Sequence, residues 1–535
     1  MNHLFAVPLV GIVAFAAMLA SPDGRSPTAL ASANPNDFGA ERFTPAIPQV
    51  WDDAVIASLE LPSVEPAYSP KQITADYYYQ IPVRPIYRSY PVYRPDREPP
   101  GYLESLLQRE PEIVWDDRDH RPDLQTGSDW LKAGEVVFGA PILFDQRAIS
   151  SADQKGFLPD PAWYERTGTP VTREGIVPAF SYVIREKGKV EIGTLACAMC
   201  HTRVMPDGAL LKGTQGNFPL DRATADDVRT NPAALPFNVV LERMLYKTPW
   251  LRPDPLDARA GMTAEEFAAV YDAVPSGVVA RHGLRPDQPV QIPDLIGVQG
   301  RRYLDRSGLQ RHRDIGDLMR YAALNQGADF LAASGDWVPM TELMGGHSLP
   351  ENPRDAPPGM IERYSDEQLY ALALYVYALE PSPNPNPFDA RAERGKEIFA
   401  AEGCVKCHDP AQGYTNNKLI AAPGFKVPDD HPERVNIMNR RVGTDAAMTL
   451  TTRRGTGLYK VPSLRGLWYR GPFEHNGSVA TLEDWFDPHR LDDDYVPTGW
   501  KGPPGTTTRA VKGHEFGLDL SSDETEALIA FLKTL

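Results

Sequence analysis

Apolar and polar residues recur with helical spacing at corresponding places in two parts of the chain. Helical signals begin at Asp129, and residues 133–138 (Ala-Gly-Glu-Val-Val-Phe) resemble residues 394–399 (Arg-Gly-Lys-Glu-Ile-Phe). Further along, two segments combine the spacing of a capping box with an apolar stripe at helical intervals. The first contains Ser365 and Gln368 with Leu372, Tyr375, Val376 and Leu379, and the second contains Ser521 and Glu524 with Leu528, Phe531, Leu532 and Leu535. The pattern therefore predicts one pair of helices in each part.

The first part is much the longer of the two and contains insertions. Residues 182–184 and 190–192 are rich in β-branched and aromatic side chains and flank Lys187 and Gly188, which predicts a β-hairpin. Residues 263–273 predict an additional helix. Because inserted loops are common places for substrate pockets, these insertions are candidates for a functional role, although they could equally serve only to pack the two parts together.

Proline marks the boundaries between the parts. Residues 34–128 are rich in proline and tyrosine, which excludes long helices; because disordered tracts are poor in aromatic residues, we expect an extended arm rather than a disordered linker. Residues 381–387 alternate proline with small or polar residues and predict an extended spacer. The expected domains are 129–388 and 389–535, and the expected fold class is mainly α, with loop and short β insertions.

All four cysteines fall in two Cys-x-x-Cys-His motifs. These are Cys197, Cys200 and His201 in the first part, and Cys404, Cys407 and His408 in the second. Cysteines three positions apart on a helical turn can each form a thioether to one vinyl group of the same haem, and the following histidine is then directed at the iron. A zinc site would need further ligands at matched spacing, and a disulfide would leave each histidine unexplained. The motifs predict two covalently bound haem c groups.

A second repeat follows each motif. Residues 292–297 (Ile-Pro-Asp-Leu-Ile-Gly) match residues 461–466 (Val-Pro-Ser-Leu-Arg-Gly), and in the same register Arg301 meets Arg470. Together with the repeated helices, this predicts a duplicated haem domain. Arg301, Arg302, Arg465 and Arg470 are candidates for pairing with haem propionates, since a guanidinium group suits a carboxylate; the alternative is exposure to solvent.

Charge and the start of the chain bear on partners and location. The formal net charge of −16 argues against nucleic acid or an anionic membrane surface as a partner. An apolar run over residues 4–20, with small residues at 31–33, predicts an export signal over residues 1–33. Haem c is attached outside the bacterial cytoplasm, so we expect a periplasmic protein. The run is also close to membrane-spanning length, and an uncleaved anchor is the alternative.

The C-terminal part resembles a known family. Residues 460–466, 471–478 (Gly-Pro-Phe-Glu-His-Asn-Gly-Ser) and 481–484 are similar to the C-terminal haem domain of bacterial di-haem cytochrome c peroxidases and of the related methylamine-utilisation di-haem enzyme. The arm, the long first domain and residues 513–517 (Gly-His-Glu-Phe-Gly) look closer to the di-haem rubber oxygenases. The resemblance implies two cytochrome c-like domains in tandem. It also implies Ca²⁺ between them, for which the sequence offers no evident ligand set.

The resemblance leaves the second axial ligand of each iron open. At the C-terminal haem, His408 is proximal, and the facing ligand is His514 or, in register with the peroxidases, His489; Met438 and Met448 are weaker candidates. At the N-terminal haem His201 is proximal, and Asn217 stands where peroxidases carry a switchable histidine. Asn217 is then either a hydrogen-bond donor to the oxidant at an open iron or a turn residue. His282, His312 and His347 are further candidates to close that iron.

The axial ligands decide the function. An iron with two strong ligands transfers electrons, whereas one with an open side can bind oxygen or peroxide. The leading hypothesis is an oxidoreductase whose N-terminal haem activates H2O2 or O2 while the C-terminal haem relays electrons from a redox protein or an organic donor. One alternative is a non-catalytic di-haem electron-transfer cytochrome, and another is a cytochrome subunit that serves a separate dehydrogenase.

Overall fold

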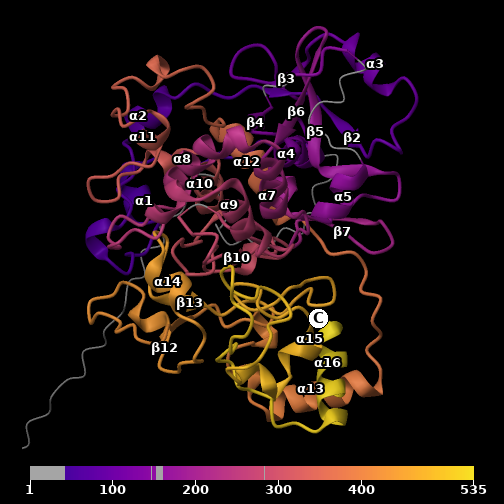
Figure 1. Ribbon diagram of the computed structural model, residues 1–535, viewed down its shortest axis with the longest axis vertical. Coiled ribbons are helices and arrows are strands. Elements are labelled where there is room, and N and C mark those ends of the chain that lie inside the picture. Colours follow the sequence, from indigo (N-terminus) through magenta and orange to yellow (C-terminus); the bar gives the residue numbers. More distant parts are fainter. Residues whose placement is uncertain (1–41, 146–147, 152–160, 282) are drawn as a thin grey trace, which may run out of the picture.

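The computed structural model describes residues 42–145, 148–151, 161–281 and 283–535. The expected export signal, residues 1–33, lies outside these ranges. Within them, none of the helices combines the length and the apolar character needed to cross a membrane. The chain forms two lobes. The segment 381–387 connects them along one side as an extended, mostly exposed stretch without regular secondary structure (Figure 1).

The centre of the first lobe is a pair of packed helices, α4 (Gly127–Gly139) and α12 (Asp366–Tyr377). Helix α12 begins with the expected capping box between Ser365 and Gln368. The two helices cross at Gly134, where a Cβ atom would lie 2.0 Å from the carbonyl oxygen of Ala371. Only glycine allows so close a backbone approach.

The second lobe repeats this arrangement with α13 (Ala390–Ala401) and α16 (Ser522–Lys533). Ser521 and Glu524 form the second expected capping box. The crossing point is Gly395, where a Cβ atom would lie 1.9 Å from the carbonyl oxygen of Ala527. Gly134 and Gly395 occupy the same place in the two similar segments of sequence, so the predicted pair of helices is found in each lobe.

Strands and further helices enlarge the first lobe. The predicted hairpin is confirmed: β5 (Ile176–Glu186) and β6 (Lys189–Thr194) pair in antiparallel fashion, with Tyr182 opposite Ile192. They form the middle of a four-stranded sheet with β2 (Ser89–Tyr93) and β4 (Leu143–Phe144) at its edges. Helices make up 35% and strands 13% of the structure, so the fold is mixed and the expectation of a mainly α fold needs correction. The inserted strands and the long loops of the first lobe lower the helical fraction of the structure.

Shorter elements complete the two lobes. The other helices are α5 (Pro161–Thr167), α6 (Cys197–Cys200), α7 (Leu220–Thr230), α8 (Leu235–Tyr246), α9 (Ala264–Asp272), α10 (Ile315–Asn325), α11 (Met340–Leu343), α14 (Ala447–Thr451) and α15 (Leu482–Trp485). The other strands are β7 (Thr202–Val204), β8 (Leu210–Lys212), β9 (Val278–Val279), β10 (Val290–Gln291), β11 (Leu419–Ala421), β12 (Ile437–Met438) and β13 (Leu458–Lys460). Helix α9 is the additional helix expected over residues 263–273.

The N-terminal segment packs along both lobes. It carries α1 (Asp53–Ala57), α2 (Ala75–Gln80), β1 (Ile86–Tyr87), α3 (Tyr102–Leu107) and β3 (Ile113–Trp115). Trp51 stacks on Tyr78 with 4.3 Å between ring centroids, and both are fully buried in the core that also contains α4, α10 and α12. Leu61 packs in the second lobe with Leu419 and Leu458. Trp51, Tyr78 and Trp115 of this segment are buried, and its other tyrosines are half-buried.

A buried ion cluster joins the lobes and the arm. Arg454, which follows α14 in the second lobe, lies 3.2 Å from Asp329 of the first lobe and 3.8 Å from Glu60 of the arm. Arg453 lies 3.8 Å from the other oxygen of Asp329. Asp329 is 1% exposed, so the cluster holds the three parts together inside the protein.

Candidate functional site: two cavities with Cys-x-x-Cys-His motifs

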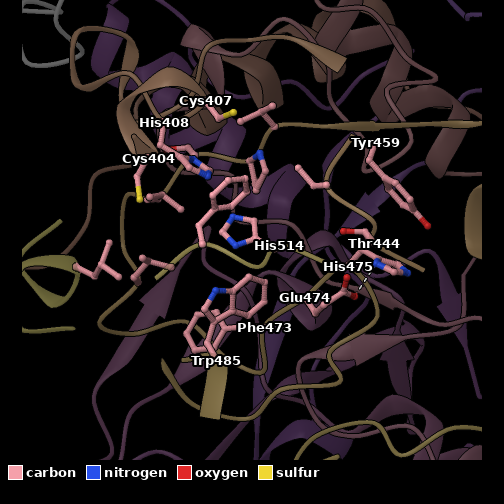
Figure 2. Close-up of a pocket in the computed structure, with 18 of the residues that line it drawn as sticks. Cys404, Cys407, His408, Thr444, Tyr459, Phe473, Glu474, His475, Trp485 and His514 are labelled. Carbon is pink, nitrogen blue, oxygen red and sulfur yellow. Dashed lines mark ion pairs between the residues drawn. The ribbon is translucent and has the colours of Figure 1, made fainter. Parts of the chain in front are cut away.

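Each lobe contains a cavity beside one of the motifs. The second-lobe cavity has a volume of about 200 Å³ and is lined by Cys404, Cys407 and His408. Gly403, at φ 71°, turns the chain from α13 into the motif. Apolar side chains of the two crossing helices and the following loops form the walls: Phe399, Leu467, Phe473, Leu482, Leu528 and Leu532. Figure 2 shows the motif on one side of this space.

His514 faces His408 across this cavity. The two ring centroids are 6.3 Å apart. A metal bound to both imidazoles would account for this separation, because it equals two metal–nitrogen bonds of about 2 Å plus the distance from nitrogen to centroid in each ring. His408 Nδ1 lies 3.1 Å from the carbonyl oxygen of Tyr414, which leaves its Nε2 free to bind a metal. Burial lowers the pKa of His514 to about 3, so its imidazole is neutral, the form that binds metals.

The loop around His514 is fixed from several sides. The buried Arg490 guanidinium donates to the carbonyl oxygens of His514 and Gly513, both at 2.9 Å. The imidazole also lies edge-on to Trp485 and Phe516, at 5.1 and 5.2 Å between centroids. His514 itself adopts φ 52°, a strained conformation for a non-glycine residue, which these contacts hold in place. Among the described residues, its Nδ1 has no hydrogen-bond partner.

The structure does not place His489 in this cavity. Its side chain is 80% exposed and its Nδ1 lies 3.0 Å from Asp487. The alternative assignment of His489 as an axial ligand is therefore corrected: η12 (Pro488–Leu491) turns that side chain to the surface while Arg490, one position later, points inward.

A buried acid–imidazole pair lies at the edge of the same cavity. Glu474 and His475 line it, with 2.5 Å between Glu474 Oε2 and His475 Nδ1 (Figure 2). The His475 ring lies 4.8 Å from that of Tyr459, between centroids. Burial opposes ionisation of Glu474, but His475 and the backbone N–H of Asn476 together lower the pKa of Glu474. The lowered pKa favours the carboxylate form of Glu474, which lines this cavity.

The first-lobe cavity has a volume of about 180 Å³ and is lined by Cys197, Cys200 and His201. Helices α4, α10 and α12 supply apolar walls, among them Phe138, Leu318, Leu372 and Val376. Burial and the nearby Arg281 guanidinium lower the pKa of His201 to about 3, so this imidazole too is neutral. Thiols, a neutral imidazole and apolar walls are what a covalently attached haem requires, and both cavities therefore fit the group.

The residues facing His201 differ from those facing His408. Within the described ranges, no histidine other than His201 lines this cavity. Its polar lining includes Tyr321, Asn325 and Gln326 at the end of α10, and Met448 supplies a thioether. The Gln326 amide nitrogen lies 3.9 Å from Cys197 Sγ, and its carbonyl oxygen has no partner in the part of the chain described.

The remaining histidine candidates for this iron are placed elsewhere or lie outside the described residues. His312 is held at both ring nitrogens, 2.6 Å from the carbonyl oxygen of Arg301 and 2.6 Å from the Tyr377 hydroxyl. His347 is exposed. His282 is not among the described residues. Neither His312 nor His347 is available to a metal in this cavity.

Asn217 does not reach the first-lobe cavity. Its side-chain oxygen accepts a hydrogen bond from Val204 N at 3.0 Å, and its amide donates to Val204 O at 2.9 Å. Both polar atoms are thus used to hold β7. The expectation of a role beside the oxidant is corrected in favour of the turn residue, because a side chain bonded twice to the backbone is not free to face an iron.

The predicted arginines separate into two groups. Arg301 donates to the carbonyl oxygens of Asp294 and Ile296, and Arg470 donates to those of Ser463 and Arg465, at equivalent positions of the two repeats. Arg301 lines the first-lobe cavity and Arg470 the second. Arg465 is exposed and lines neither cavity, so its expected role is corrected: the turn at Gly466 directs it outward.

Two basic residues were missed by the sequence interpretation. Arg306 and Lys460 line the space between the cavities. The signal in the sequence was their position: Lys460 directly precedes one repeat, and Arg306 follows the other. No group of three or more potential metal-binding side chains occurs in the described ranges, so the expected Ca²⁺ stays a prediction without an assigned site.

Comparisons with known proteins give short regions of similarity. No protein-family model matches the chain. It is 32% identical to an uncharacterized protein, y4iJ, of Sinorhizobium fredii over 137 residues, 20% of this chain and 21% of that protein. It is 27% identical to the cytochrome c551 peroxidase of Nitrosomonas europaea over 143 residues, 26% of this chain and 33% of that protein. The chain thus spans between a fifth and a third of the length of these relatives.

One solved structure is similar over a larger share of the chain. A MauG-like protein associated with microbial copper homeostasis aligns with 46% of this chain and 73% of its own, at 16% identity. The TM-score of 0.26 is too low to carry an argument about the fold.

Proposed function

We propose that the chain is an exported, periplasmic di-haem c-type oxidoreductase of the cytochrome c peroxidase type, with one haem in each lobe. The 143 residues similar to a cytochrome c551 peroxidase support this reaction class. The repeated helix pairs with Gly134 and Gly395 at their crossings support two cytochrome c-like domains in tandem. The arm and the His514 loop support a place near the di-haem rubber oxygenases.

The observation that carries the proposal is the difference between the two cavities. In the second lobe His408 and His514 face each other, with ring centroids 6.3 Å apart, and would occupy both axial positions. In the first lobe no described histidine faces His201. A haem with two imidazole ligands supplies electron transfer, and one with an open side supplies binding of H2O2 or O2.

The residues of the first-lobe cavity have three tasks in this proposal. Cys197, Cys200 and His201 hold the cofactor, and the apolar walls from α4, α10 and α12 exclude water. The amides of Asn325 and Gln326, at the end of α10, belong to the polar lining of this cavity and would orient a small oxidant. The Gln326 carbonyl oxygen, which lacks a partner among the described residues, is free to accept a hydrogen bond from peroxide.

The electron donor in this proposal is a redox protein or an organic molecule. The net charge of −16 favours a basic redox protein over an anionic one. The second-lobe cavity is the entry point for electrons, because its metal would be closed to exogenous ligands by His408 and His514.

Low-temperature EPR of the purified ferric protein tests the proposal, because it reports the spin state of each haem. We expect one high-spin signal, from the first-lobe haem, and one low-spin signal from the second. Addition of peroxide to the half-reduced protein should then change the first-lobe signal. Two low-spin signals that persist after one-electron reduction and peroxide addition would instead identify a non-catalytic electron-transfer cytochrome.

A further inference from the structure

The strip of protein between the two cavities is basic. Arg301 and Arg306 come from the first lobe, and Lys460 and Arg470 from the second. All four line a cavity of about 20 Å³ that lies between the two larger ones. Of the two larger cavities, Arg301 lines only the first-lobe cavity, and Arg470 lines only the second-lobe cavity. Arg306 lines all three.

These cations outnumber the anions beside them. Three acidic groups act on the four cations: Asp294 and Asp305 of the first lobe and Glu474 of the second. Asp294 already accepts hydrogen bonds from the Tyr469 hydroxyl at 2.7 Å and from Ile296 N at 2.8 Å. Burial, together with repulsion from Arg470 and Arg301, lowers the pKa of Arg306 to about 9. A buried excess of positive charge is unfavourable unless anions join it.

The donors of the cluster are only partly used. Lys460 donates to the carbonyl oxygens of Tyr303 and Leu304, at 3.1 and 2.7 Å. The Nε atoms of Arg301, Arg306 and Arg470 are buried and have no acceptor among the described residues. Because buried polar groups in folded proteins are normally hydrogen-bonded, these three donors point to a bound group with several oxygen acceptors.

We propose that the four residues form one carboxylate-binding site shared by the propionates of both haems, with Arg306 as the cation common to the two. The inference rests on the proposed function only in requiring a haem in each lobe. Planar guanidinium groups match carboxylates in geometry and charge. Arg301 then serves the first-lobe haem, Arg470 serves the second, and Arg306 lies within reach of both.

A shared cation links the redox properties of the two haems. Positive charge near a haem favours its reduced form, which carries one positive charge less. Because the strip is buried, solvent screens the interaction less than it would at the surface. Loss of the charge at Arg306 should therefore lower both midpoint potentials, whereas loss of the charge at Arg301 or Arg470 should lower only one.

Potentiometric titration of the di-haem protein, followed by visible and EPR spectroscopy, tests this inference. We expect R306Q to lower the midpoint potentials of both haems, R301Q to lower that of the first-lobe haem alone, and R470Q to lower that of the second-lobe haem alone. R302Q is the matched control, since Arg302 neighbours the cluster in sequence but is 51% exposed and pairs with Glu433. It should shift neither potential.

The outcomes separate this inference from the proposed function. A shift at only one haem in R306Q, or at neither, would overturn the shared site. If R306Q does not fold, R306K keeps the charge and should retain both parental potentials, and the absence of any shift in R301Q and R470Q would still overturn the inference. The response to peroxide is measured separately, so an inert first-lobe haem would contradict the proposed activity and leave the shared site standing.

Discussion

At the scale of single residues, the second-lobe site depends on one strained histidine. His514 has a positive φ, yet its imidazole faces His408 because Arg490 holds the backbone of the loop and two aromatic rings hold the side chain. Neighbouring Gly513, at φ 91°, lies so close to Thr444 that a Cβ atom would be 2.4 Å from its backbone nitrogen. The position of the His514 imidazole thus depends on the backbone of two segments that are far apart in sequence.

Replacement of His514 gives the first prediction. If a haem occupies the second-lobe cavity as proposed, H514A should remove one axial ligand of its iron, and the EPR signal of this haem should change from low spin to high spin. H489A removes an exposed histidine from the same lobe and should leave the spectrum unchanged. A low-spin second-lobe haem in H514A would show that another residue binds the iron.

At the scale of elements, the two helix crossings determine how closely each lobe can pack. Both crossings bring a glycine against the backbone of the partner helix, at Ala371 in one lobe and Ala527 in the other. Since α4 and α12 also wall the first cavity, their spacing sets the width of that cavity. A side chain at either glycine would push the helices apart.

G134A tests the first crossing. The new methyl group would overlap the Ala371 carbonyl, and overpacking of this kind costs about 1–3 kcal/mol or more. Denaturant unfolding should report this loss in the free energy of unfolding. G139A lies in the same helix, where an added Cβ meets nothing within 4 Å, and it should be neutral or slightly stabilising. Equal effects of the two variants would contradict the role of the crossing.

The inserted helices carry a buried acid that should make stability depend on pH. Asp221, at the start of α7, is 3% exposed, and burial raises its pKa to about 8. In the unfolded chain this carboxyl loses its proton near its usual pKa of 3.8. Between these two pH values the folded protein binds more protons than the unfolded chain, so the stability of the folded state falls as the pH rises. The contribution of protonated Asp221 to stability is fully present below about pH 4 and is lost as the pH rises through about 8.

D221N should therefore flatten the fall in stability between pH 5 and pH 8. The slope removed is at most about 1.4 kcal/mol per pH unit, the value for one proton. Urea unfolding of parent and variant across this range measures it. D207N, at an exposed aspartate, should keep the parental slope; an unchanged slope in D221N would mean that another buried group controls the pH dependence.

At the scale of the whole molecule, the arm and the ion cluster join the two lobes. The covalent connection between the lobes is only the extended, proline-rich linker over residues 381–387. Asp329 is the central anion of that cluster, since it contacts both Arg453 and Arg454. The lobes therefore depend on buried charge pairing as well as on apolar packing.

D329A should weaken the whole assembly. Removing the carboxylate leaves two buried guanidinium groups short of an anion, and breaking a buried pair in this way costs about 3–5 kcal/mol. Calorimetry should show a lower thermal midpoint, with separate transitions for the two lobes. E526A removes only an exposed pair with Arg391 and should have little effect. A single transition at the parental temperature in D329A would count against this role.

The sequence identified features that repeat and missed those that depend on chain geometry. The Cys-x-x-Cys-His motifs, the helix pairs and the equivalence of Arg301 with Arg470 were visible because each occurs twice. The choice between His514 and His489 was not, since it depends on whether a short turn directs a side chain inward or outward. The two alternatives for Asn217, and those for Arg465, could not be separated for the same reason. Arg306 lines cavities of both lobes only because the lobes meet, and no local pattern encodes that meeting.

The arm also has a consequence for the order in which the protein is assembled. The arm precedes both lobes in the chain and is synthesised before them. Because Leu61 N donates to the carbonyl oxygen of Leu309 and the Leu61 side chain packs on Leu419 and Leu458, the arm has no complete docking surface until the second lobe has been made. Contacts between segments so distant in sequence form slowly. Cys200, meanwhile, is buried once the first lobe has closed. If haem is attached at Cys200 as proposed, we expect attachment before the first lobe closes, and the late docking of the arm extends the interval in which it can occur.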